Sequence, residues 1–220
     1  MKSNKLGAYL APAEYIDSDH PEIISFAASV TMPNMTAKEK VQQFYLAARE
    51  IRYDTSLDYS NAEVYRASSV LRAGNAYCVG KAALFAALCR CEGVPARVAF
   101  ADVTNHLASD KLIEKMGTNL FAWHGFTEVF LENRWVKASP TFNSDLCSLF
   151  GVTPLDFDGN ADAILQDYDG QGRAFMKYEV LHGSFHDVPA KFLASEIKRL
   201  YPGLVIDDRL DFLTSAKSRD

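Results

Sequence analysis

The sequence lacks several features that would place it outside the ordinary globular proteins. None of its apolar runs approaches the roughly 20 residues needed to span a bilayer, and residues 1–5 do not lead into the apolar core of a signal peptide. There is no internal repeat and no low-complexity linker. With 220 residues, of which 48% are hydrophobic and 23% charged, the chain predicts a single soluble domain over residues 1–220 with a cytoplasmic location.

Positive charge is also scarce. The chain has 23 Lys and Arg residues against 28 Asp and Glu residues, which gives a formal net charge of -5 at pH 7. Binding to a phosphate backbone depends on a basic surface, and this composition provides no excess of basic residues. We therefore expect no nucleic-acid partner, and the lack of a membrane-spanning run leads us to expect no membrane partner.

Cysteine is too rare for a disulfide framework in a chain of this length, and a reducing compartment would keep the thiols free. The four positions are Cys78, Cys89, Cys91 and Cys147. Cys89 and Cys91 lie two residues apart on a predicted helix and point away from each other, which argues against a metal site.

Two other patterns can be compared with known metal motifs. His182 and His186 would share a face only on a helix, whereas Gly183 between them predicts a loop. The acidic segments 156–159 and 167–172 do not have the spacing of an EF-hand and predict turns. We therefore expect no metal and no cofactor.

The most informative segment runs from Gly74 to Phe100. Apolar side chains cover nearly every face over residues 79–88, which predicts a helix enclosed by protein, and Gly93 ends it. Cys78 lies in the first turn, where free N–H groups and the helix dipole favour a thiolate. Cys78 is therefore a candidate nucleophile, although a free cysteine also packs well as a small apolar residue.

Several other segments have the periodicity of helices or strands. Thr36 and Glu39 have the spacing of a capping box and predict a helix to residue 51, and Ser60 begins a second pattern of this kind. Strands are predicted at residues 97–103, 125–131 and 135–138, the last two joined as a hairpin by a polar turn. Further helices are predicted at residues 19–28, 61–71, 109–116 and 187–200.

A thiol nucleophile needs a base, and a third group must orient that base. The five histidines are His20, His106, His124, His182 and His186. His124 precedes the first hairpin strand, where a rigid backbone could hold its imidazole toward the helix mouth. The chain order is therefore cysteine helix, strand, histidine strand and a further strand.

This order and its motifs, GNAYC at 74–78, GVPAR at 93–97, HGFTEVFL at 124–131 and SPT at 139–141, resemble the transglutaminase-like superfamily of papain-type thiol enzymes. The likeness is to a bacterial stand-alone branch, with a core at about 36–145. It implies an α+β fold in which the nucleophile helix packs on an antiparallel sheet, and a Cys–His–Asp triad. By position Cys78 is the nucleophile and His124 the base, whereas Ser139 occupies the place of the acid. Asn143 or Asp145 is the alternative orienting group.

The resemblance also implies a reaction. We expect acyl transfer at an amide bond through a thioester on Cys78, with hydrolysis of a peptide or protein amide favoured over transfer to an amine acceptor. The Cys78 N–H would meet the oxyanion together with a side-chain donor from Tyr77, Asn75 or Tyr65. Because Ser139 replaces the acid, a catalytically silent binding or regulatory module is the alternative. Acetyl transfer from acetyl-CoA, as in arylamine N-acetyltransferases, is a third hypothesis.

Overall fold

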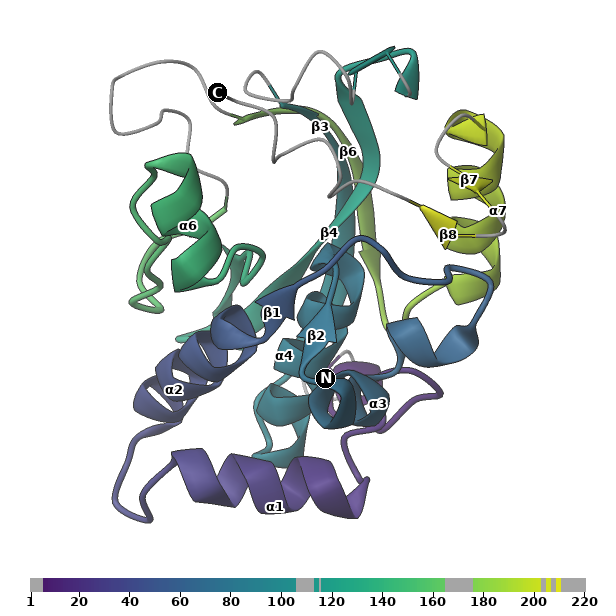
Figure 1. Ribbon diagram of the computed structural model, residues 1–220. Coiled ribbons are helices and arrows are strands. Elements are labelled where there is room, and N and C mark those ends of the chain that lie inside the picture. The colour runs from purple at the N-terminus through teal and green to yellow at the C-terminus, as the bar shows by residue number, and fades with distance from the viewer. Residues whose placement is uncertain are drawn as a thin grey trace.

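The structure is a computed structural model that describes residues 6–105, 113–114, 116–164, 176–202, 205–206 and 209–210. Helices surround a curled antiparallel sheet, so the predicted α+β class is confirmed (Figure 1). In chain order the elements are η2 (Gly7–Tyr9), α1 (Pro21–Val30), α2 (Ala37–Glu50), β1 (Arg52–Tyr53), η3 (Ala62–Tyr65), α3 (Ala67–Ala73), β2 (Asn75–Ala76), α4 (Cys78–Cys91), β3 (Ala96–Asn105), β4 (Leu120–Leu131), β5 (Arg134–Ala138), α6 (Ser144–Phe150), β6 (Met176–Phe185), α7 (Ala190–Leu200), β7 (Val205–Ile206) and β8 (Arg209–Leu210).

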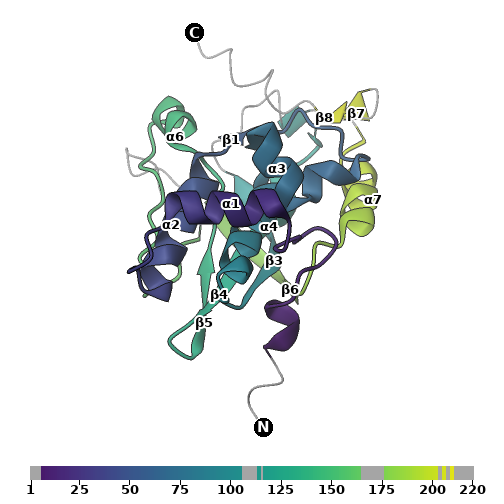
Figure 2. The ribbon, with the colours of Figure 1, turned by 90° about the horizontal axis from the view of Figure 1, so that it is seen from below.

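Helix α4 is the centre of the core. It contacts α1, α2 and α3 on one side and strands β3 and β4 on the other, and every residue from Cys78 to Arg90 is buried. Figure 2 shows α1 lying across α4, with α2 and α7 on opposite sides of the molecule. The helix predicted at residues 79–88 is therefore confirmed together with its enclosure by protein, because an apolar surface on all faces needs partners on all faces.

Two cationic side chains lie within this apolar helix. The Lys81 ammonium donates to the backbone carbonyls of Arg49, at 2.7 Å, and Ile51, at 2.6 Å, at the end of α2. Arg90 donates to the carbonyl oxygens of Ala96 and Ala11 at 2.9 and 2.8 Å, and also to that of His186. These acceptors offset part of the cost of burying the two groups and join α4 to its surroundings. Burial still lowers the pKa of Lys81 to about 7 and that of Arg90 to about 10.

The main sheet has the strand order β5-β4-β3-β6, and all neighbours are antiparallel. Strands β4 and β5 form the predicted hairpin, although β4 begins five residues earlier than expected, at Leu120. The turn residues Glu132 and Asn133 have φ angles of 49° and 65°. Such positive angles match the twist of a tight hairpin.

The capping box that begins α2 is confirmed, since the Thr36 side chain accepts from the backbone N–H of Glu39 and the Glu39 side chain accepts in return. The box predicted at Ser60 is wrong, because Asn61 is the capping residue and accepts from the N–H of Glu63 at 3.0 Å.

The loop predicted around Gly183 is also wrong. Residues 182 and 183 belong to β6, where Gly183 has a φ of 97° beside a register shift, so the glycine marks a bulge and does not end the strand.

Some predicted segments lie partly or wholly outside the described residues. Of the helix predicted at 109–116, residues 109–112 and 115 lie outside them, as does the whole acidic turn at 167–172. His106 also lies outside the described residues. None of the helices in the part of the chain that the structure describes has the length and apolar character of a membrane span.

Candidate active site

Cys78 is the first residue of α4, and its side chain is almost enclosed, with 8% of the residue exposed. Burial raises the pKa of the thiol to about 11, against the opposing effect of the backbone N–H groups of Gly125, Val79 and Cys78 itself. The desolvation cost of the anion is therefore larger than the benefit from the helix mouth. At neutral pH the resting side chain is a thiol.

Gly125 allows strand β4 to approach the first turn of α4. A Cβ atom at this position would lie only 2.9 Å from both Cα and Cγ2 of Val79. The glycine therefore permits close contact between the strand backbone and the helix, and this contact brings its N–H group to the Cys78 sulfur. A glycine inside a strand is a sequence signal for such an approach, although it does not identify the partner.

His124 immediately precedes Gly125 and is 7% exposed. Its Nε2 atom lies 3.3 Å from Oγ of Ser139, and Ser139 Oγ lies 2.8 Å from Oγ1 of Thr141. Burial lowers the pKa of the imidazole to about 4. Within the described ranges, no carboxylate hydrogen bonds to this ring, so its orienting partner is the Ser139 hydroxyl.

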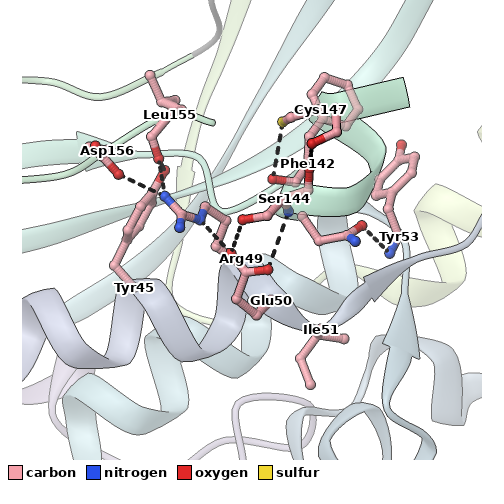
Figure 3. Close-up of polar contacts among 12 residues, drawn as sticks. Tyr45, Arg49, Glu50, Ile51, Tyr53, Phe142, Ser144, Cys147, Leu155 and Asp156 are labelled. Atoms are coloured by element: carbon pink, nitrogen blue, oxygen red, sulfur yellow. Dashed lines mark hydrogen bonds and ion pairs between the residues drawn. The ribbon is translucent and has the colours of Figure 1, made fainter. Parts of the chain in front are cut away.

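A polar network at the end of α2 joins Tyr45 and Arg49 to Leu155 and Asp156 (Figure 3). The Tyr45 hydroxyl donates to the carbonyl of Leu155 at 2.8 Å and lies 3.3 Å from that of Ser139. Arg49 donates to Leu155 O and to Asp156 at 3.0 and 2.8 Å. These contacts hold the backbone of Ser139 and of residues 155–156 against the end of α2.

The same network continues to the start of α6. Glu50 accepts from the backbone N–H and hydroxyl of Ser144 at 3.2 and 2.8 Å. Asn143, the alternative orienting residue, accepts from the backbone N–H of Tyr53 at 3.1 Å. The Asn143 oxygen is therefore engaged with β1 and does not bond to His124, while Asp145 is exposed.

Two of the three side chains considered for the oxyanion site donate to other groups. Asn75 donates to Asp54 at 2.8 Å, and the Tyr65 hydroxyl donates to the carbonyl of Tyr59 at 3.0 Å. The Tyr77 ring packs edge-to-face on Tyr59 and Tyr65, with centroids 4.9 and 5.9 Å apart. The Tyr77 hydroxyl is buried without a hydrogen-bond partner among the residues that the structure describes. The sequence reasoning did not identify the backbone N–H of Gly125, which lowers the pKa of the Cys78 thiol.

Tyr178 on β6 was also missed. Its ring meets those of His124 and Phe126 edge-on, with centroids 6.2 and 5.9 Å apart. No motif connects a tyrosine on this edge strand with the histidine, because their proximity depends on sheet pairing between distant segments. Elsewhere in the described residues, no group of three or more His, Cys, Asp or Glu side chains is arranged to hold a metal ion.

Comparison with known proteins places residues 24–140 within the model of the transglutaminase-like superfamily. Among solved structures, one described as a "putative cysteine protease" from Cytophaga hutchinsonii is similar, with 16% identity and a TM-score of 0.46. The match covers 83% of this chain and 56% of that chain, so the protein spans little more than half the length of that relative. No curated protein matches.

Proposed function

Because the chain belongs to the transglutaminase-like superfamily, we propose that it transfers acyl groups from amides through a thioester on Cys78, with water as the main acceptor. The observation that carries this proposal is the arrangement around the thiol. The backbone N–H groups of Val79 and Gly125 lower the pKa of the thiol, and the neighbouring residue His124 has its imidazole held by Ser139. Donors for an oxyanion and a base thus come from two rigid elements.

Proton transfer accompanies attack in this mechanism, because the pKa values of about 11 for Cys78 and about 4 for His124 keep both groups neutral at rest. The sulfur bonds to the amide carbonyl while its proton moves to the His124 nitrogen that does not face Ser139. The carbonyl oxygen becomes an oxyanion, which the backbone N–H groups stabilise. His124 then protonates the leaving amine, and the C–N bond breaks to give the thioester.

Release of the acyl group uses the same base. His124 accepts a proton from water as the water oxygen attacks the thioester carbonyl, and the thiol and a carboxylic acid are formed. A primary amine in place of water would give a new amide, so the two outcomes share every step up to the acceptor. We propose peptide or protein amides as substrates, and a cytoplasmic location in which the free cysteines remain reduced.

Ser139 is the observation that favours a second candidate function. A hydroxyl accepts a hydrogen bond from the imidazolium but cannot stabilise it as a carboxylate does. Because the thiol and the imidazole are both neutral at rest, the fold can also hold these side chains without catalysing a reaction. The alternative proposal is therefore a catalytically silent binding or regulatory module.

Digestion of a defined mixture of denatured proteins tests the enzyme proposal. We expect new peptide N-termini or released ammonia, both lost in Cys78→Ala and in His124→Ala, while Cys91→Ala remains active. Addition of a primary amine measures transfer relative to hydrolysis. If the wild type releases nothing and its Cys78 is never acylated, the enzyme proposal is wrong and the silent module is favoured.

A further inference from the structure

Strand β4 contains a left-handed residue directly before His124. Trp123 has a φ of 58°, and among the described non-glycine residues only Glu132 and Asn133, in the hairpin turn, share a positive φ. For a bulky L-residue this conformation costs about 1–2 kcal/mol, and it persists only where the surroundings enforce it.

The strain coincides with a bulge in the pairing of β3 and β4. Ala101 pairs with His124 and Val103 with Phe121, so Asp102 alone faces the two residues Ala122 and Trp123. An extra residue of this kind changes which side chains point to each face of the sheet. The bulge therefore sets the direction of the His124 imidazole.

Side chains bind the two N–H groups of the bulge. The N–H of Trp123 donates to Oδ1 of Asp102 at 3.1 Å. The N–H of Ala122 donates to the Tyr201 hydroxyl at 2.6 Å, and this hydroxyl donates to the carbonyl of Leu120 at 2.9 Å. The left-handed backbone is therefore held from β3 and from the end of α7.

His182 on β6 contacts both Asp102 and Trp123. Its Nε2 lies 2.6 Å from Oδ1 of Asp102, and the imidazole must be the donor when the carboxylate is ionised. The same ring stacks on the Trp123 indole, with centroids 4.0 Å apart and an interplanar angle of 19°. Phe192 of α7 meets the indole edge-on at 4.7 Å. Trp123 is thus fixed through its backbone and through its ring.

We propose that Asp102 and His182 are positioning residues for the thiol site. Asp102 holds the Trp123 N–H in the left-handed conformation, and His182 holds Asp102 against the indole. The two residues that follow, His124 and Gly125, consequently keep the imidazole against Ser139 and the backbone N–H close to the thiol. This inference rests on the proposed function, because it gives Asp102 and His182 a role in supporting that base and that donor.

The test measures alkylation of Cys78 by iodoacetamide at pH 7, followed by peptide mass spectrometry in a Cys91→Ser background. Asp102→Ala should slow alkylation by about 10-fold or more, because misplacement of a catalytic group by about 1 Å has effects of this size. Asp102→Asn, which keeps an acceptor for the N–H, should retain most of the rate. The matched control is Glu39→Ala, since Glu39 also accepts a backbone N–H, that of Thr36, at 2.7 Å, at the start of α2 and away from the site.

A second comparison separates positioning from general loss of structure. In a Trp123→Gly background the left-handed backbone is no longer strained, so Asp102→Ala should there change the rate by less than about 2-fold. His182→Phe keeps an aromatic ring to stack on Trp123 but removes the hydrogen-bond donor to Asp102. It should slow alkylation in the protein that retains Trp123. His182→Phe replaces Asp102→Ala in both backgrounds if the latter does not fold.

The outcomes distinguish the two proposals. If His124→Ala slows alkylation but Asp102→Ala and His182→Phe do not, the positioning role is wrong and the proposed function stands. An equal slowing by Asp102→Ala in both Trp123 backgrounds also overturns the positioning role. If His124→Ala itself reacts at the wild-type rate, the proposed function fails whatever the Asp102 variants do.

Discussion

Replacing Ser139 by aspartate should convert the neutral site into one with a charged third member. Ser139 is 2% exposed, its Oγ lies 3.3 Å from Nε2 of His124, and Thr141 lies close enough to donate a hydrogen bond to the new carboxylate. Solvent screening is weak at so buried a position. The carboxylate should therefore stabilise the imidazolium form of His124.

The size of the effect follows from the present pKa. Burial lowers the pKa of His124 to about 4, and a carboxylate within hydrogen-bonding distance raises the pKa of a base by roughly 1–3 units. The variant should titrate at roughly 5–7, which corresponds to about 1.4–4 kcal/mol in favour of imidazolium. The equilibrium from thiol and imidazole to thiolate and imidazolium should rise by the same factor, about 10- to 1000-fold.

Titration of the His124 ring by NMR measures this change directly, and Cys78 alkylation at pH 6 provides the functional readout. The matched control is Ser139→Asn, which has nearly the size of aspartate without its charge. We expect a raised His124 pKa and alkylation at least about 10-fold faster in Ser139→Asp only, from the lower end of that range. If Ser139→Asp leaves the His124 pKa unchanged or lowers it, Ser139 does not occupy the position that orients the base.

Three further predictions concern the surroundings of the site. Gly125→Ala should lower the free energy of unfolding by about 1–3 kcal/mol through overpacking. The control is Gly7→Ala, whose Cβ meets nothing within 4 Å, so its denaturation curve should match that of the wild type. A wild-type curve for Gly125→Ala would contradict the close approach of β4 to α4. Burial lowers the pKa of Lys81 from 10.5 to about 7. Between these pH values the unfolded chain binds more protons at this residue than the folded chain does. The contribution of Lys81 to the free energy of unfolding therefore rises with pH, by at most about 5 kcal/mol. Urea unfolding at several pH values should show a smaller rise in stability in Lys81→Met than in the wild type. An equal dependence of stability on pH in the two proteins would refute this prediction. Thr36→Ala should cost about 1 kcal/mol of stability in thermal unfolding, through loss of the capping box, and an unchanged melting temperature would show that the box contributes little.

The central helix and the hairpin could be predicted because their signals are local. Apolar residues on every face of α4 require a buried helix, and the polar turn at Glu132 and Asn133 separates two strands of β-forming residues. Ser139 directly follows β5, which pairs with β4, and its Oγ lies 3.3 Å from Nε2 of His124 on β4.

What could not be predicted depends on contacts between distant segments. A tryptophan gives no sign that it adopts a positive φ, and the bulge at Trp123 appears only when Asp102 and Tyr201 meet the same strand. Asn143 was a reasonable orienting group by chain distance, yet its oxygen accepts the N–H of Tyr53. Sequence spacing limits which residues can meet, and the pairing of strands decides which of them do.

The most direct test of the central claim is to trap the acyl-enzyme. The protein is incubated with p-nitrophenyl acetate, and the acetylated residue is identified by peptide mass spectrometry. Sulfur attack at the ester carbonyl releases p-nitrophenolate, so we expect a burst of p-nitrophenolate and one acetyl group on Cys78 that hydroxylamine removes. Both should be absent in Cys78→Ala and strongly reduced in His124→Ala. An unmodified Cys78, or a burst that persists in Cys78→Ala, would contradict acyl transfer through this thiol.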